Sequence, residues 1–357
     1  MPQEIEKEDI FMLGTELLKG QGLGNQLFCY VTARCIAKKR GMDFAILGGE
    51  TLANNIHSQC GLYFMDLDLG KEATKDDFIN GTYWEHEDRL YIGNSKHDMT
   101  HGCYVTGTDW KMYETKDNTL LMGNMQAEDY FREYKDEIKE WLKVKPEYDC
   151  YEYSRDHLCI LHLRCSDYLD CPELFLRRKY WLDGMKHMKT IDPQMEFMII
   201  TNDVKEASKI LPGIPAYNFD LAKDYTIIKN AKYLLLANSS FTCFPAFCSE
   251  TVQYILAPKY WARHNVSNGY WASEQNIYDG WHYMDRHAKV FTSDECRAEL
   301  EAFKKNSKEY ARLNQRPEGA EKRREEFKSK LFLKKYRIIR FWRSVKRKLR
   351  IALKMEG

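Results

Sequence analysis

The sequence predicts an α/β fold in which two Rossmann-like domains face a cleft, with a basic amphipathic helix at the C-terminus. Apolar runs of strand length alternate with segments of helical periodicity, a pattern typical of parallel sheets covered by helices. The chain has 357 residues, 44% of them hydrophobic, which is enough to bury two modest cores. The end of the chain differs in composition from the rest because it is strongly basic, so it is assigned to a separate helix.

The chain is expected to divide into four segments. These are an N-terminal Rossmann-like domain (1–150), a second Rossmann-like domain (151–293), a charged helical linker (294–320) and a basic tail (321–357). The domain boundary follows from a polar run, 144–149, which separates a helix ending near Leu142 from the strand that leads to His162. Ligands of open parallel sheets bind at the carboxyl ends of the strands. Functional residues are therefore sought where apolar runs give way to polar loops.

A glycine-rich turn lies near the N-terminus, after a short first strand expected near Thr15 to Leu18. The run Gly20-Gln21-Gly22-Leu23-Gly24-Asn25 precedes apolar residues at helical spacing. Glycines let the backbone approach a ligand closely, and the start of a helix favours negative charge. The spacing matches neither the dinucleotide fingerprint nor a Walker loop. The turn is nevertheless a candidate for binding an anionic ligand through Gly22, Gly24 and Asn25.

A second candidate is the run Leu161-His162-Leu163-Arg164-Cys165-Ser166-Asp167-Tyr168, which follows a strand-like segment. The guanidinium of Arg164 offers a rigid fork of donors that matches phosphate oxygens. Asp167 is the first candidate for a general base. Two other interpretations remain open, because Asp167 could be only the ion-pair partner of Arg164 and His162 could be an ordinary buried histidine.

The third candidate is a loop of small polar residues that follows the apolar run Tyr233 to Ala237. In Asn238-Ser239-Ser240-Phe241, backbone N–H groups and serine hydroxyls could together form an anion site. The loop could instead be a plain N-cap of a helix that begins near Ala246, and both roles are compatible.

With these three motifs the chain resembles the bacterial α-1,2-fucosyltransferases, inverting enzymes of glycosyltransferase family 11 that use GDP-fucose. The resemblance covers roughly residues 15 to 257. It rests on Gly22-Leu23-Gly24-Asn25-Gln26-Leu27-Phe28-Cys29-Tyr30, on His162 to Tyr168, on Thr201-Asn202-Asp203, on Asp224-Tyr225, and on Ala237 to Phe241, in family order. The chain departs from the family at Cys165, where a second arginine is usual, and at Cys243-Phe244-Pro245, which replaces an aromatic pair.

The resemblance implies a GT-B-like fold, with the acceptor on the N-terminal domain and the GDP-sugar mainly on the second. It implies transfer of fucose to a glycan hydroxyl, in the family the 2-hydroxyl of galactose. For this reaction the chemistry of the residues makes Arg164 the expected group that stabilises the leaving diphosphate and Asp167 the first candidate for the base. The residues expected to bind the donor are Gly22, Gly24, Asn25, His162, Arg164, Asp203, Asp224, Asn238, Ser239, Ser240 and Phe241. Asp203 could be only a helix cap, whereas Asp224 could hold nucleoside hydroxyls.

No metal or other cofactor is expected, because the matched motifs themselves contain no Asp-x-Asp pair of the metal-using kind. Two alternatives stay open. The Cys165 departure is compatible with a non-catalytic protein that binds a GDP-sugar or a glycan, and the enzyme could use another GDP-sugar. The 11 cysteines are scattered without a Cys-x-x-Cys pair, which favours reduced thiols in the cytoplasm. No signal peptide or membrane-spanning run is expected.

The basic tail has 15 Lys or Arg and 4 Glu within 321–357, a net charge of +11, so the rest of the chain carries −10. On a helix, one stripe would contain Leu331, Ile338, Trp342, Val345, Leu349 and Leu353. The pattern predicts a helix lying on an anionic membrane. Such a helix would place an enzyme of polysaccharide biosynthesis, with lipid-linked glycans as candidate acceptors, at the cytoplasmic face of the membrane. The tail could instead dock on the acidic body or stay solvated, and nucleic acid is a less favoured partner.

Overall fold

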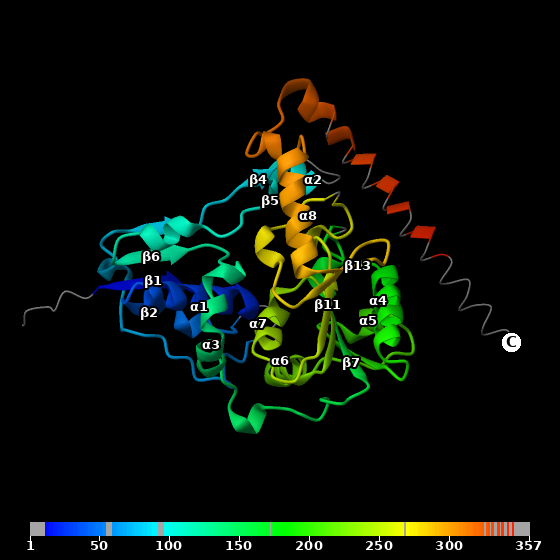
Figure 1. Ribbon diagram of the computed structural model, residues 1–357, viewed down its shortest axis with the longest axis horizontal. Coiled ribbons are helices and arrows are strands. Elements are labelled where there is room, and N and C mark those ends of the chain that lie inside the picture. Colours follow the sequence, from blue (N-terminus) through cyan, green and yellow to red (C-terminus); the bar gives the residue numbers. More distant parts are fainter. Residues whose placement is uncertain are drawn as a thin grey trace, which may run out of the picture.

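The computed structural model describes residues 11–345 except 55–58, 92–95, 172, 268, 325, 329, 332–333, 336, 339–340 and 343–344 (Figure 1). Its two main sheets confirm the predicted α/β fold with two parallel-sheet halves, as in GT-B proteins. Leu349 and Leu353 of the predicted tail stripe lie outside the described residues.

The N-terminal half is built on a four-stranded parallel sheet. Its strands are β1 (Met12–Glu16), β2 (Asp43–Leu47), β3 (Thr82–Trp84) and β6 (Thr119–Met122), in the order β2-β1-β6-β3. Strand β1 begins earlier than the predicted Thr15, because the apolar residues Met12 and Leu13 are buried in the sheet. Helix α1 (Leu23–Lys39) connects β1 to β2, and a small antiparallel pair, β4 (Arg89–Leu90) and β5 (Cys103–Tyr104), lies beside helix α2 (Lys96–His101).

The second half is built on a seven-stranded sheet. Its strands are β7 (Leu158–Leu163), β8 (Glu196–Thr201), β9 (Ala216–Tyr217), β10 (Tyr233–Leu236), β11 (Tyr254–Pro258), β12 (His282–Met284) and β13 (Val290–Thr292). They lie in the order β9-β8-β7-β10-β11-β12-β13, and only β13 is antiparallel. Counted along this half of the chain, the parallel strands follow the Rossmann order 3-2-1-4-5-6. The order reverses between β7 and β10, so this is the point at which a ligand is expected.

Helices cover both faces of this sheet. Helices α4 (Arg178–Ile191) and α5 (Val204–Ile210) pack on one face, and α6 (Leu221–Asn230) and α7 (Cys243–Phe247) pack on the face toward the N-terminal half (Figure 1). Between the halves the chain runs through α3 (Lys135–Trp141). After β13, α8 (Ser293–Asn306) returns to the N-terminal half, where Arg297 pairs with Glu128 at 3.3 Å. The linker predicted for 294–320 therefore also bridges the halves.

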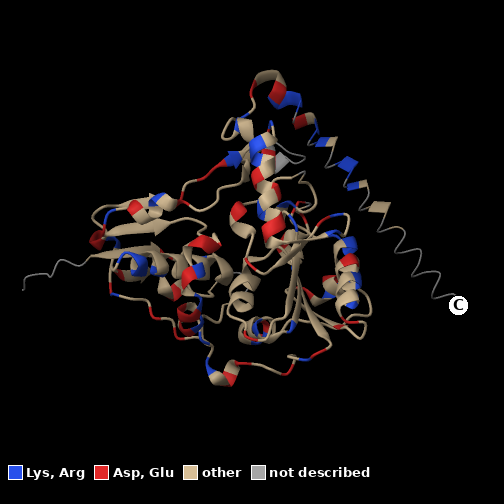
Figure 2. Ribbon diagram, viewed as in Figure 1, with Lys and Arg blue, Asp and Glu red and all other residues tan. Residues whose placement is uncertain are grey.

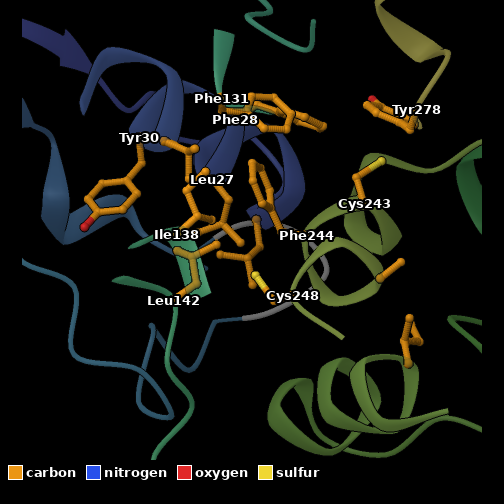
Figure 3. Packing of buried hydrophobic residues seen from close by; sticks show 14 of the residues in the cluster. Leu27, Phe28, Tyr30, Phe131, Ile138, Leu142, Cys243, Phe244, Cys248 and Tyr278 are labelled. Carbon is orange, nitrogen blue, oxygen red and sulfur yellow. The ribbon is translucent and has the colours of Figure 1, made fainter. Parts of the chain in front are cut away.

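The two halves share a hydrophobic core. Phe28 of α1 and Phe131 belong to the N-terminal half, and both rings contact Phe244 of α7, at centroid distances of 4.8 and 5.5 Å (Figure 3). Aromatic pairs of this kind add stability beyond the apolar area that they bury. The two halves are therefore in direct contact at these rings, whose packing fixes the position of α1 relative to α7.

Candidate functional site

Two polar loops lie side by side at the point where the strand order reverses. His162 is near the end of β7 and pairs in register with Leu236 of β10, and the Ala237 N–H donates to the His162 carbonyl at 3.0 Å. Arg164 and Asn238 therefore begin neighbouring loops. The hydroxyl of Tyr168 donates to the Asn238 carbonyl at 3.2 Å, which ties the loops together. The sequence motifs of β7 and β10 thus converge at the carboxyl edge of the sheet, where Rossmann folds bind ligands.

Arg164 lies mostly within the protein but keeps 17% of its side chain exposed, and its guanidinium pairs with the Asp167 carboxylate at 3.1 Å. The ring of Tyr168 lies 5.7 Å from the guanidinium carbon. Asp167 is more accessible, with 41% of its side chain exposed. Both interpretations of Asp167 remain compatible with this geometry, because an exposed carboxylate can hold the arginine in place and still be reached by a substrate hydroxyl.

His162 is buried and uncharged. Burial, helped by the nearby positive charge of Arg164, lowers the pKa of its imidazole to about 3. Its Nδ1 has no hydrogen-bond partner within the described part of the chain, and the ring lies 5.8 Å from that of Phe241. His162 is therefore not the fully satisfied core histidine that was the alternative interpretation.

Two further buried polar atoms without a partner among the described residues lie at the same edge. They are Asn202 Nδ2, after β8, and Asn238 Oδ1, after β10. The other side-chain atoms of both residues are engaged, since Asn202 Oδ1 accepts from the Cys165 N–H at 2.8 Å and Asn238 Nδ2 donates to the Leu174 carbonyl at 3.0 Å. Buried polar atoms without partners are uncommon and call for an explanation. Three of them along one sheet edge mark this edge as a place for binding polar groups.

Asn202 was missed as an individual site residue. The motif Thr201-Asn202-Asp203 was recognised, but Asp203 was selected from it. In the structure Asp203 is the N-cap of α5 and accepts from the Glu206 N–H at 3.0 Å, the alternative role considered for it. The position of Asn202, directly after a buried strand, was the signal that could have identified it.

The serine loop differs in one respect from the prediction. The helix that follows it, α7, begins at Cys243 and not near Ala246, and a 3-10 turn over Ser240–Thr242 leads into it. The Ser239 carbonyl accepts from the Thr242 N–H at 3.2 Å, whereas the Ser239 side chain makes no capping hydrogen bond. Within the described residues the hydroxyls of Ser239 and Ser240 are thus not committed as caps.

The glycine-rich turn lies directly against the serine loop. A Cβ atom on Gly24 would lie 2.3–2.5 Å from backbone atoms of Ser240 and Phe241, closer than side chains approach, so glycine is required there. Gly22, the N-cap of α1, has open space around it. Asn25 Oδ1 accepts from Gln126 Nε2 at 3.2 Å. The first predicted motif is therefore adjacent to the third, although it belongs to the other half of the protein.

Asp224 lies in the first turn of α6, at the same edge of the sheet. Its carboxylate accepts from the Phe219 N–H at 3.2 Å. Burial, with a smaller effect from the negative charge of Asp220, raises the pKa of Asp224 to about 7. The carboxyl group therefore exchanges its proton near neutral pH and could bind a hydroxyl in either state.

Replacing Asp224 with asparagine is expected to stabilise the protein near neutral pH. Below about pH 4 the carboxyl group is protonated in both the folded and the unfolded wild type. As the pH rises toward 7 the unfolded chain releases this proton while the folded protein keeps it, so the wild type loses stability relative to the variant. Denaturant unfolding of both proteins from pH 4 to 8 should show a difference that grows by at most about 4 kcal/mol. A pH-independent difference would contradict the shifted pKa. If Asp224 holds nucleoside hydroxyls, GDP binding should weaken in the same variant.

No protein-family model matches the sequence. The chain is similar to an alpha-1,2-colitosyltransferase of Escherichia coli, with 24% identity over 174 residues that cover 43% of this chain and 60% of that protein. Among solved structures, the selenomethionine form of the fucosyltransferase NodZ from Bradyrhizobium has 12% identity and a TM-score of 0.39, covering 68% of this chain and 93% of that one. NodZ alpha-1,6-fucosyltransferase soaked with GDP-fucose has 12% identity and a TM-score of 0.36, covering 67% and 93%.

The curated relative confirms the predicted resemblance to the fucosyltransferase type of glycosyltransferase. The chain spans about 60% of the length of that relative.

Proposed function

We propose that this relative of a glycosyltransferase transfers fucose from GDP-fucose to a hydroxyl group of a glycan, with inversion at the anomeric carbon and without a metal ion. The observation that carries the proposal is the convergence of Arg164, His162 and the serine loop at the switch point of a Rossmann sheet, facing the start of α1. Asn202 Nδ2, which donates, and the uncommitted hydroxyls of Ser239 and Ser240 suit the oxygens of a nucleoside diphosphate, whereas Asn238 Oδ1 can accept from a donor group of the ligand.

Arg164 would stabilise the leaving group. In the transfer, the oxygen of the acceptor hydroxyl forms a bond to the anomeric carbon, while the bond from that carbon to the β-phosphate oxygen breaks and its electron pair stays on GDP. The negative charge that develops on the diphosphate can be held by the guanidinium fork and by N–H and hydroxyl donors of the serine loop. A cation and several oriented donors at one edge can carry this charge, which is why no metal is proposed.

Asp167 would accept the proton of the acceptor hydroxyl. Without substrate, its carboxylate is paired with Arg164 at 3.1 Å. When the diphosphate binds, it competes for the same guanidinium, and the exposed carboxylate becomes available to a hydroxyl within hydrogen-bond reach. Asp167 would thus have both roles considered for it. It would pair with Arg164 before the donor binds and accept the proton of the acceptor hydroxyl afterwards.

Cys165 does not favour the non-catalytic alternative. Its side chain is fully buried in the core of the second half, and burial raises the pKa of its thiol to about 12. Its backbone N–H donates to Asn202 at the edge. The side chain at position 165 is therefore part of the core beside Arg164 and adds no charge to this edge.

Calorimetric titration with GDP, GDP-fucose and GDP-mannose, each with and without EDTA, tests the donor. We expect GDP-fucose to bind in both conditions and GDP to be released slowly from it in the absence of acceptor. The relative's name makes GDP-linked colitose a fourth ligand to compare, because colitose is fucose without its 3-hydroxyl. Absence of binding by every GDP species would overturn the proposal, and binding that EDTA abolishes would overturn its metal-independent part.

The acceptor is tested separately. The proposal places fucose on the 2-hydroxyl of a terminal galactose, so a galactoside should be converted while its 2-deoxy analogue should not. The two acceptors differ by a single hydroxyl and therefore form a matched pair. Equal conversion of both would show that another hydroxyl accepts the sugar.

A further inference from the structure

The tail helix carries a stripe of apolar side chains that nothing in the described protein covers. The described residues between Gly319 and Val345 are helical, and the side chains of Phe327, Leu331, Ile338, Phe341 and Trp342 are 48–63% exposed. With 3.6 residues per turn, these five positions fall within an arc of about 100°. Large apolar side chains gathered on one exposed face mark an interaction surface.

Basic residues flank this stripe on both sides. By the same helical spacing, Lys328 and Lys335 lie along one side, and Lys330 and Arg337 along the other. Long basic side chains beside an apolar face can keep their charges at a polar boundary while the face enters an apolar layer. Figure 2 shows this basic character along the tail, away from the mixed charges of the body.

The beginning of the tail is held by the body, whereas its continuation is not. Asn314 Oδ1 accepts from the Arg89 N–H at 2.8 Å, the Arg316 guanidinium lies 5.0 Å from the ring of Tyr91, and Arg312 pairs with Glu321. Beyond this point the helix runs away from the sheets (Figure 1). The acidic body therefore does not cover the stripe in this structure. The helix starts beside β4 and β5, a pair that belongs to the N-terminal part of the chain and packs against Tyr270 of the second half.

We propose that this helix docks the protein on a membrane surface of anionic lipid, with the stripe in the lipid layer and the flanking cations at the headgroups. The charge distribution favours an anionic partner for the tail. The segment 321–357 carries a net charge of +11 and is attracted to a negative surface, whereas the rest of the chain carries −10 and is repelled by it. The contiguous apolar arc selects lipid over nucleic acid, which needs aromatic rings spread for base stacking. No helix among the described residues is long and apolar enough to cross a bilayer.

The docking also bears on the substrate, and this step rests on the proposed function. Docking would hold the protein at the lipid surface, where a glycan carried on a lipid is presented. Such a glycan is the acceptor class that the docking favours.

Sedimentation with vesicles tests the docking directly. The full chain should bind vesicles of phosphatidylcholine with about 30% phosphatidylserine, and added salt should weaken the binding because charge screening acts on exposed cations. The double variant Leu331→Ala, Trp342→Ala should bind at least 10-fold more weakly. Trp110→Ala is the matched control, since Trp110 and Trp342 are equally exposed, at 56% and 57%, and Trp110 lies on the body.

Three outcomes would overturn the docking. They are equal binding to vesicles of phosphatidylcholine alone, unchanged binding of the double variant, and displacement from vesicles by an oligonucleotide at similar concentration. Transfer to a soluble acceptor should be unaffected in the double variant, so the docking and the proposed function can fail independently. For the lipid-carried acceptor, a glycan anchored in anionic vesicles should be used at least 10-fold better than the same glycan in solution. Equal use would remove that step alone.

Discussion

Replacing Arg164 with alanine is expected to lower the rate of sugar transfer by at least about 100-fold, or roughly 2.7 kcal/mol of transition-state stabilisation, the scale for removing one donor to a developing anion. The effect should fall mainly on kcat, because the charge on the departing diphosphate is largest in the transition state. Steady-state kinetics with GDP-fucose measure it, and thermal unfolding checks the fold. The side chain is partly exposed and lies at the edge of the sheet, so the fold should persist.

Two further variants test what the guanidinium of Arg164 contributes. Arg164→Lys keeps the charge but not the fork of donors and should recover only part of the activity. Arg155→Ala is the matched control, because Arg155 is exposed and pairs with Glu196 at the opposite edge of the same sheet. Near-normal turnover of Arg164→Ala would exclude this residue as the group that holds the diphosphate.

Asp167→Asn then distinguishes the two roles of the carboxylate. A general base that is lost lowers kcat and removes the acidic limb of its pH profile. If the carboxylate only positions the guanidinium, donor binding should weaken while the shape of the pH profile is retained. The two results differ in kind, so a moderate loss of activity alone would not be mistaken for proof of base catalysis.

The sequence predicted those parts of the site that depend on single strands. An apolar run that breaks into polar residues identifies the carboxyl end of a strand, and such ends share one edge of a parallel sheet. His162, Arg164, Asn238 and Ser239 were found in this way, without knowledge of the strand order. The start of α7 was placed too late, near Ala246; the helix begins at Cys243, and Pro245 is tolerated because it lies in the first turn, where a missing N–H costs little.

Contacts between the halves could not be predicted from these patterns. The helical spacing of Phe28 shows that it is buried but not that its partner is Phe244, which lies far along the chain. The same holds for the edge atoms, because burial of Asn202 Nδ2 and Asn238 Oδ1 depends on how three loops pack. Local patterns carry information about faces and ends of elements, whereas the identity of packing partners arises from the whole fold.

Gly24→Ala is expected to have the second large effect, on stability and on turnover together. A Cβ at 2.3–2.5 Å from the Ser240 and Phe241 backbone must move that loop by roughly 1 Å to reach an ordinary contact distance. Overpacking of this kind costs about 1–3 kcal/mol, more than the gain of about 1 kcal/mol from alanine in a helix. A shift of about 1 Å in groups that orient a substrate can lower turnover by about 100-fold.

Gly22→Ala is the matched control for this prediction. Its backbone has φ −69° and ψ 150°, which any residue can adopt, and a Cβ there meets nothing within 4 Å. Thermal stability should therefore stay near that of the unchanged protein in Gly22→Ala, whereas thermal stability and kcat should both fall in Gly24→Ala. Normal stability and turnover of Gly24→Ala would show that the contact is loose in solution. The expected difference between the two variants has one physical source. Gly24 of the N-terminal half lies directly against the serine loop of the other half, and a Cβ at this position would displace that loop.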